Sequence, residues 1–277
     1  MTDKYAVIGN PISHTKSPLI HGLFAKATGQ DIEYGAIEGP TDTPEGFAGA
    51  VRAFQAAGGR GLNITTPFKL QAFEMADERS ERAQMAGAVN ALKFGVDGRI
   101  SADNFDGVGL VNDIQRNLCV ALRGKRVLML GAGGAVRGAL LPFLAQQPAE
   151  LVLANRSAQK AGQLAAALAQ HGNLRGGSYA EIGEGRFDVV VNATSASLRG
   201  ELPPLLPTVF APDGLAYELA YGKGLTPFLR LAQNAGVKRL ADGVGMLVEQ
   251  AAEAFEWWRG VRPGTSPVIA QLTIPLS

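Results

Sequence analysis

The segment NITTPFK, residues 63–69, places a lysine where local physics disfavours one. GLNIT is typical of the end of a strand, and Thr66 followed by Pro67 predicts the start of a helix. Lys69 then lies in the first turn, where the helix dipole disfavours a cation by roughly 0.3–1 kcal/mol. Such an amine is either a solvated surface group or a group kept for chemistry. As the latter it would exchange a proton with substrate or stabilise negative charge on an oxygen.

A second stretch with chemical character is RVLMLGAGGAVRGALLPFL, residues 126–144, which predicts a strand, a glycine-rich turn and a helix. Gly131 and Gly133 permit a tight turn and a close approach of the backbone to a pyrophosphate. Gly134 and Ala135 keep the start of the helix small, so that its N–H groups can face phosphates. The third glycine of the usual dinucleotide motif is replaced by Val136, so a simple strand-to-helix turn is the alternative.

The end of the next predicted strand, ELVLAN, bears on the choice of cofactor. An NAD site favours an acidic residue about 20 positions after the glycines, to hold the ribose 2′-hydroxyl. Here the chain has Asn155, Arg156 and Ser157, with Lys160 one turn later. Two cations and a hydroxyl favour a 2′-phosphate, and therefore NADP, although exposed cations of no special function are the alternative.

Several polar residues interrupt apolar surroundings in the predicted elements. Asp106 is at the expected start of a helix, where an aspartate is an ordinary cap, and each of the others also has an ordinary structural explanation. Their number nevertheless favours a binding site, because polar groups that break local rules gather at such sites. The residues concerned are Ser17, Asn63, Thr65, Asn90, Asp106, Tyr221 and Gln250.

Composition excludes several classes of protein. The 277 residues carry 26 Lys+Arg and 25 Asp+Glu, a formal net charge of +1, which gives no reason to expect nucleic acid or an anionic membrane as a partner. Cys119 is the only cysteine, so no internal disulfide is possible, and with three histidines a closed zinc site is not expected. The start MTDKYAVIGNP resembles a strand rather than a secretion signal, and no apolar run is of bilayer length. We expect a cytoplasmic protein without a metal.

Strand and helix patterns alternate along the whole chain, which predicts two α/β domains with mainly parallel sheets. The first domain is expected over residues 1–106 and is completed by C-terminal helices at about 243–277. The second is a Rossmann-type domain over 107–242. A hairpin turning at Asp97-Gly98 adds an antiparallel strand to the first, and one helix is predicted from Asp106 to about Val120.

Taken together, the motifs make the sequence closely similar to the shikimate dehydrogenase family over almost the whole chain. They are NPISHTKSP, GLNITTPFK, AGAVNAL, DNFDGVG, GAGGAVRG, NRSAQKA, NATSASL, YGKGLTPF and ADGVGMLVEQAA. The resemblance implies reversible NADPH-dependent reduction of 3-dehydroshikimate to shikimate, a step of aromatic amino-acid biosynthesis. It also implies a monomer or homodimer.

The resemblance further assigns roles, all of them expectations at this point. Lys69 and Asp106 would form the catalytic acid/base pair. Substrate contacts would come from Thr15, Ser17, Asn63, Thr65, Asn90, Tyr221 and Gln250, with Thr15 and Ser17 anchoring the carboxylate. Cofactor contacts would come from Glu81, Gly131, Ala132, Gly133, Gly134, Ala135, Asn155, Arg156, Ser157, Lys160, Thr194, Ser195, Leu219 and Gly243, of which Thr194, Ser195, Leu219 and Gly243 are expected near the nicotinamide.

Three residues depart from the family pattern. Thr15 stands where serine is commoner, Phe105 replaces the threonine of the usual DNTDG, and Glu218 replaces an aspartate. We expect Phe105 to narrow the substrate pocket or to lower turnover. Two alternatives stay open: a quinate/shikimate dehydrogenase using NAD or NADP, and a catalytically silent ligand-sensing module on the same scaffold.

Overall fold

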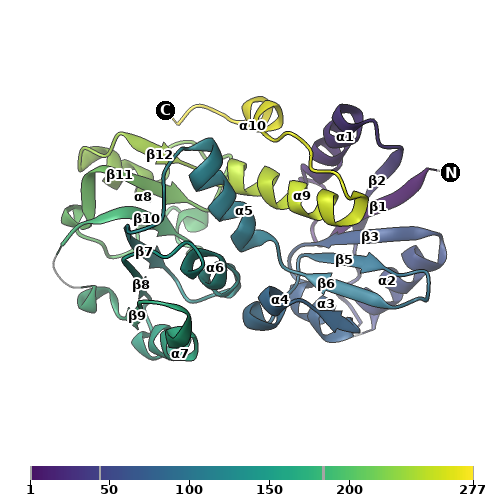
Figure 1. Ribbon diagram of the computed structural model, residues 1–277, viewed down its shortest axis with the longest axis horizontal. Coiled ribbons are helices and arrows are strands. Elements are labelled where there is room, and N and C mark those ends of the chain that lie inside the picture. Colours follow the sequence, from purple (N-terminus) through teal and green to yellow (C-terminus); the bar gives the residue numbers. More distant parts are fainter. Residues whose placement is uncertain (1, 44, 183–184, 277) are drawn as a thin grey trace. The chain divides into compact units, whose positions relative to one another are not determined.

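The computed structural model describes residues 2–43, 45–182 and 185–276. Within them the chain forms two compact units, each built on a six-stranded sheet (Figure 1). The first unit runs up to Gly109 and includes Val248–Val268, and the second consists of Leu110–Leu247 and the residues from Ile269 onward. Among the described residues, every helix is too short or too polar to span a lipid bilayer. The two α/β sheets confirm the predicted fold class.

The first sheet has the strand order β2-β1-β3-β5-β6-β4. Its pairings are parallel except between β3 and β5 and between β5 and β6, which form the predicted hairpin. The strands are β1 (Asp3–Gly9), β2 (Ile32–Glu38), β3 (Gly59–Ile64), β4 (Glu78–Arg79), β5 (Ala91–Phe94) and β6 (Ile100–Asp103). The first-unit helices are α1 (Ser17–Thr28), α2 (Gly46–Ala56), α3 (Lys69–Met75) and α4 (Glu81–Ala86).

Both faces of the first sheet are buried. Successive residues of a strand point to opposite faces, so they pack into two different core clusters. On one face Ile8 and Leu62 pack with Phe47 of α2 and with Phe68, whose rings stack with centroids 4.8 Å apart. On the other face Tyr5 stacks on Trp258 of α9 (Val244–Arg259), with centroids 4.7 Å apart. The sheet is therefore held rigidly between helices, which fixes the ends of its strands.

Phe105 belongs to this second core cluster and is only 3% exposed. Its ring meets Trp257 edge to face at 5.7 Å, and the guanidinium of Arg82 lies over it at 5.3 Å. The expectation that its side chain narrows a substrate pocket therefore has no support in its packing. Phenylalanine at this position instead adds apolar contacts beneath α9.

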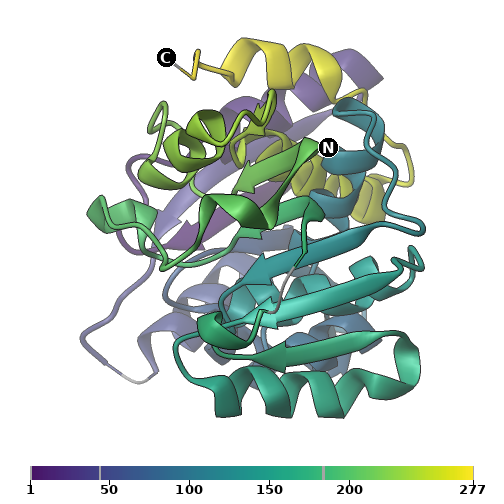
Figure 2. The ribbon, with the colours of Figure 1, turned by 90° about the vertical axis from the view of Figure 1, so that its left-hand side faces the viewer.

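The second sheet is parallel throughout, in the order β12-β11-β10-β7-β8-β9 (Figure 2). This is the doubly wound arrangement, in which the strand order reverses between β7 and β10. The strands are β7 (Arg126–Leu130), β8 (Glu150–Ala154), β9 (Leu174–Gly177), β10 (Phe187–Asn192), β11 (Phe210–Glu218) and β12 (Arg239–Ala241). The helices are α6 (Gly134–Leu144), α7 (Ala158–Leu168) and α8 (Pro227–Asn234). Its strand interiors, such as Leu128, Val152 and Val190, are buried as continuous apolar runs.

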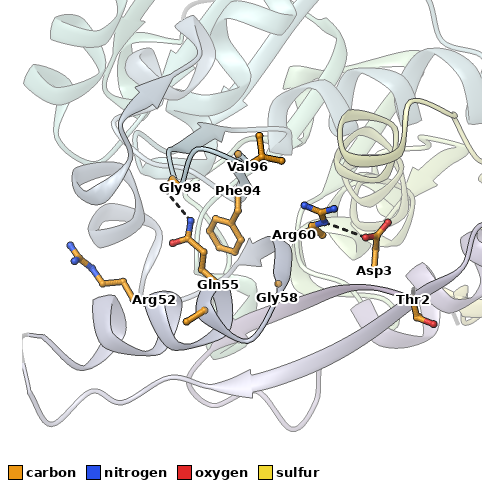
Figure 3. A pocket seen from close by; sticks show the side chains of 12 residues that line it. Thr2, Asp3, Arg52, Gln55, Gly58, Arg60, Phe94, Val96 and Gly98 are labelled. Carbon is orange, nitrogen blue, oxygen red and sulfur yellow. Dashed lines mark hydrogen bonds and ion pairs between the residues drawn. The ribbon is translucent and has the colours of Figure 1, made fainter.

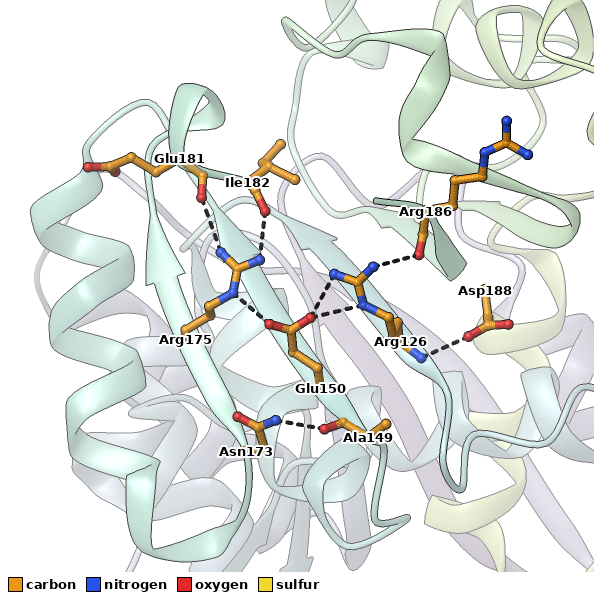
Figure 4. A network of polar contacts seen from close by, with 9 residues as sticks. All are labelled: Arg126, Ala149, Glu150, Asn173, Arg175, Glu181, Ile182, Arg186 and Asp188. Carbon is orange, nitrogen blue, oxygen red and sulfur yellow. Dashed lines mark hydrogen bonds and ion pairs between the residues drawn. The ribbon is translucent and has the colours of Figure 1, made fainter. Parts of the chain in front are cut away.

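A polar network holds the amino ends of four of these strands, β7, β8, β9 and β10 (Figure 4). The Glu150 carboxylate accepts hydrogen bonds from Arg126 at 2.9 and 3.1 Å and from Arg175 at 2.7 Å. Burial alone would raise the pKa of Glu150, but the two guanidinium groups hold it below its ordinary value. Arg126 also donates its backbone N–H to Asp188. Charges at this edge are therefore neutralised by one another.

Several local predictions were wrong. The helix after β3 begins at Lys69 and not at Pro67, because residues 66–68 form a turn in which Phe68 N–H donates to the Thr65 carbonyl at 3.0 Å. Asp106 is the first residue of its helix rather than the capping residue before it. The long helix expected from Asp106 is α5 (Asp106–Asn112) followed by a π-helical turn, Asp113–Asn117. The short elements β4, α4, β9, β12 and α10 (Ser266–Leu272) were not predicted.

His21 of α1 is the most unusual titratable group of the first core. It is completely buried, stacks on Tyr34 with centroids 4.1 Å apart, and has no hydrogen-bond partner among the described residues. Burial lowers its pKa from 6.5 to about 3, because the charged imidazolium would lose its hydration. The folded protein therefore keeps this ring neutral at any physiological pH.

This neutrality predicts a pH dependence of stability. Between pH 7.5 and pH 5.0 the unfolded chain protonates His21 and the folded chain does not, so the free energy of unfolding should fall by about 2 kcal/mol from this group alone. Urea unfolding of wild type and His21→Phe at both pH values isolates the effect, because other titrating groups are shared. A wild-type loss equal to that of the variant would contradict the assignment.

Candidate active site

The carboxyl-end edge of the first sheet gathers most of the residues predicted to bind substrate. Thr15 and Ser17 follow β1, Lys69 follows β3, and Asp106 follows β6. Because β5 is antiparallel, Asn90 just before it lies at the same edge, next to Asn63, whose neighbour across the ladder is Ala91. Residues from four separate segments thus meet at this edge of the sheet.

The centre of this arrangement is Asp106. Its Oδ2 accepts a hydrogen bond from the Lys69 ammonium, and its Oδ1 accepts one from Asn90 Nδ2 at 2.8 Å. The lysine side chain is 33% exposed and the aspartate 15%, so water reaches the pair only in part. Asp106 also lies at the positive end of α5, where a carboxylate is favourable, while Lys69 lies at the unfavourable positive end of α3. The aspartate thus offsets the cost of the lysine.

The side chain of Asn90 connects separate segments of the first unit through hydrogen bonds made by both its amide nitrogen and its amide oxygen. Its amide donates to Asp106 and, at 3.1 Å, to Gln250 Oε1 on α9, and its Oδ1 accepts the Phe105 N–H at 2.9 Å. These bonds fix which end of the amide is which. Asn90 is therefore in contact with Gln250 and with Asp106 of the Lys69–Asp106 pair.

Further hydrogen bonds involve the predicted substrate residues Thr15, Ser17 and Asn63. Thr15 Oγ1 donates to Ser17 Oγ at 3.2 Å. The Ser17 side chain favours ionisation of the Tyr34 hydroxyl, which burial opposes. That hydroxyl donates to Asn63 Oδ1 at 2.7 Å, and Asn63 Nδ2 reaches the Asn90 carbonyl at 3.3 Å. Burial raises the pKa of Tyr34 well above its ordinary value, so its proton stays in place as a donor.

Tyr34 was missed by the sequence analysis. It lies in DIEYGAIEG, which was recognised only as a strand, and a tyrosine there is unremarkable by type. Its role depends on pairing between β1 and β2, which places it beside Tyr5 and within reach of α1. Nothing in the local sequence indicates that contact.

The pocket in Figure 3 belongs to the opposite edge of this sheet. It has a volume of about 560 Å³ and is lined by Arg52, Gln55, Arg60, Phe94 and others around the amino end of β3. Arg60 is paired there with Asp3 at 3.2 Å, and Gln55 donates to the Gly98 carbonyl. No predicted site residue lines it, so it is separate from the candidate site.

In the second unit, the glycine loop has the form that a dinucleotide requires. Gly131 adopts a φ of +112°, and a Cβ there would lie 3.2 Å from the Ala193 carbonyl oxygen. A Cβ on Gly133 or Gly134 would point into open space, so the glycines leave room beside the backbone. The α6 N-terminus has no side-chain cap and no acidic residue in its first turn, which leaves its N–H groups to an anion. These residues, with Ala132 and Ala135 in the same turn, fit a pyrophosphate.

The residues predicted to hold a 2′-phosphate follow β8. Ser157 caps α7 by accepting the Lys160 N–H at 3.4 Å, and Asn155 donates to the Ser157 carbonyl at 3.1 Å. Arg156 and Lys160 are exposed at the start of the helix. The turn is thus rigid while its cations reach solvent, as binding of a soluble phosphate requires.

The remaining predicted residues lie at the carboxyl ends of β10, β11 and β12, with one exception. Thr194 and Ser195 follow β10, and Leu219 and Tyr221 follow β11. Gly243 admits no side chain, because its Cβ would lie 2.1 Å from the Leu219 carbonyl oxygen. The exception is Glu81, which begins α4 in the first unit behind the cap residue Ser80. The described residues contain no group of His, Cys, Asp and Glu suited to a metal ion.

Known proteins are similar to this chain over almost its whole length. Three family models match: the shikimate dehydrogenase substrate binding domain at residues 7–92, shikimate / quinate 5-dehydrogenase at 113–199, and the shikimate 5′-dehydrogenase C-terminal domain at 243–273. The shikimate dehydrogenase (NADP(+)) of Nitrosospira multiformis is 55% identical over 272 residues, covering 98% of both chains.

Solved structures are similar over the whole length. An Ael1 enzyme from Pseudomonas putida is 65% identical with a TM-score of 0.96, covering 100% of both chains. A shikimate 5-dehydrogenase from Thermus thermophilus, in complex with NADP(H) and shikimate, is 32% identical with a TM-score of 0.81, covering 97% of this chain and 98% of that one.

Proposed function

Because the chain belongs to the shikimate dehydrogenase family, we propose that it catalyses the reversible NADPH-dependent reduction of 3-dehydroshikimate to shikimate. The observation that carries the proposal is the Lys69–Asp106 pair, bridged through Asn90 to Gln250 at the sheet edge that also holds Ser17 and Asn63. The single cysteine agrees with the reducing cytoplasm as its compartment. As a family property, we expect a monomer or homodimer.

The chemistry assigned to the chain is binding, orientation and proton handling. When bound, NADPH supplies the hydride to the carbonyl carbon of the substrate. As the carbon–hydrogen bond forms, the carbonyl oxygen takes the electron pair of the former π bond and needs a proton. The Lys69 ammonium provides that proton and stabilises the developing charge, and Asp106 holds the ammonium in place. In the oxidative direction the pair takes the proton of the hydroxyl.

The other predicted contacts would set the orientation of the ring. Hydroxyls of Thr15 and Ser17 anchor the carboxylate, while the amides of Asn63, Asn90 and Gln250 and the hydroxyl of Thr65 face the ring hydroxyls. Tyr221, at the end of β11, is a further proposed substrate contact. The support within the first unit is the set of hydrogen bonds from Thr15 to Ser17, from Tyr34 to Asn63 and from Asn63 to the Asn90 carbonyl.

A matrix of initial rates with shikimate or quinate and NADP or NAD tests the function. We expect kcat/KM to be highest for shikimate with NADP. Arg156→Ala should reduce the preference for NADP over NAD roughly tenfold or more, the effect of losing a hydrogen bond to a charged group. Arg230→Ala, at an exposed position of α8, is the matched control. A preference for quinate or NAD would favour a quinate/shikimate dehydrogenase. Absence of shikimate-dependent NADPH formation would favour a catalytically silent ligand-sensing module.

Replacement of the lysine tests the acid/base assignment. Lys69→Ala should lower kcat by roughly 10²–10⁴-fold, the usual range for a general acid/base, and change the Kd of shikimate only a few-fold. Lys26→Ala, an exposed lysine of α1, should leave both constants unchanged. A kcat of Lys69→Ala close to that of wild type would contradict the assignment of Lys69 as the general acid/base.

Tyr34 provides a test of the hydrogen-bond chain. Tyr34→Phe should raise the KM for shikimate about five- to tenfold, equivalent to about 1–1.4 kcal/mol, because Ser17 and Asn63 lose their shared partner. The change in kcat should stay below about twofold. Tyr5→Phe, on the neighbouring strand β1, removes a hydroxyl that accepts a hydrogen bond from Arg259, and serves as the control. A loss confined to kcat would contradict the positioning role.

A further inference from the structure

A buried carboxylate at the end of β11 has no place in the site described so far. Glu218 is the last residue of β11 and is fully buried. Its Oε2 accepts hydrogen bonds from Asn192 Nδ2 at 3.0 Å, from Thr226 Oγ1 at 3.1 Å and from Ser197 Oγ, and its Oε1 accepts the Ala220 N–H at 3.3 Å. Four donors from three segments therefore converge on one side chain.

The hydrogen-bond pattern determines the charge of Glu218. Ser197 Oγ accepts from Asn192 Nδ2 at 3.1 Å, so its own hydrogen is directed to the glutamate. Every contact of the carboxyl group is with a donor, which is the pattern of an ionised carboxylate. Burial raises the pKa of Glu218, and these four donors oppose that shift. No lysine, arginine or histidine of the described chain forms an ion pair with it, so the negative charge is not cancelled locally.

The location connects this charge with the predicted nicotinamide residues. In doubly wound sheets, ligands bind outside the carboxyl ends of the strands, and Asn192 and Glu218 end the neighbouring strands β10 and β11. Asn192 Oδ1 accepts both the N–H and the hydroxyl of Thr194, at 3.2 and 2.8 Å. Leu219 is the residue directly after Glu218. Of the four residues predicted to contact the nicotinamide, Leu219 follows Glu218 in the sequence and Thr194 is hydrogen-bonded to Asn192, a partner of Glu218.

We propose that Glu218 is a positioning residue for the nicotinamide end of the cofactor, and that its uncancelled negative charge favours binding of NADP⁺ over NADPH. The inference rests on the proposed function. The oxidised nicotinamide ring carries a positive charge and the reduced ring is neutral, so a fixed buried carboxylate near the bound ring would stabilise the two forms unequally. The same carboxylate, through Asn192 and Ser197, holds the loop that follows β10.

The experiment is a pair of titrations with the full chain. The Kd values of NADP⁺ and NADPH are measured at pH 7.5 for wild type, Glu218→Gln and Glu218→Asp, and thermal unfolding shows that each variant is folded. Glu218→Gln should weaken NADP⁺ more than NADPH, moving the ratio of the two Kd values about three- to thirtyfold. Glu218→Asp keeps the charge and has the residue usual in the family, so its ratio should stay within about twofold of wild type.

The matched control is Glu150→Gln, which removes a partly buried carboxylate from the amino-end edge of the same sheet (Figure 4). Its ratio should equal that of wild type, however much stability it loses. Equal weakening of both cofactor forms in Glu218→Gln would overturn the charge effect, and unchanged Kd values would overturn the positioning role as well. If Glu218→Gln does not fold, a large ratio change in Glu218→Asp overturns the proposal. Failure of wild type to bind either cofactor form would instead refute the proposed function.

Discussion

The ion pair between Lys69 and Asp106 is the interaction on which the first unit's site depends. Each residue begins a helix, and the positive end of a helix repels the lysine and attracts the aspartate. Asp106 is favourable at the positive end of its helix without a partner, whereas Lys69 at the positive end of its own helix needs a nearby carboxylate. Pairing the two makes an otherwise unfavourable ammonium stable while leaving a third of its side chain exposed to react. Asn90 then fixes the second oxygen of Asp106, so the carboxylate cannot rotate away.

The antiparallel hairpin is what makes this pair possible. In a purely parallel sheet, the residue before β5 would lie at the amino edge, away from the end of β3. Reversal of β5 brings Asn90 to the carboxyl edge, and the return of β6 brings Asp106 there too. The Asp97-Gly98 turn, with Gly98 at a φ of +83°, is remote from the chemistry but sets the register of both strands.

The amino-acid sequence predicted the long helices and strands and most of the residues that meet at the candidate site. Prediction failed where a feature depends on contacts between distant segments, or where the segment is short. The glycine loop was recognised because strand, glycines and helix are contiguous. Strands of two to four residues, such as β4, β9 and β12, are too short to show an alternating pattern. Thr66 and Pro67 have the composition of a helix start, yet they form the turn before it. Tyr34 and the partners of Glu218 could not be predicted, because hydrogen bonds between distant segments leave no local pattern.

Two buried titratable groups, His21 and Glu218, are kept in different charge states, neutral and negative, by their surroundings. His21 is enclosed by aromatic rings, which cannot replace the hydration of a cation, so it stays neutral and adds no charge behind the Ser17–Tyr34–Asn63 chain. A charged group there would interact with an anionic substrate independently of the hydroxyls that orient it. Glu218 is enclosed by donors that do replace its hydration. These donors offset part of the cost of burying the charge; under the proposal above, the positively charged ring of NADP⁺ offsets more of it, and the neutral ring of NADPH does not.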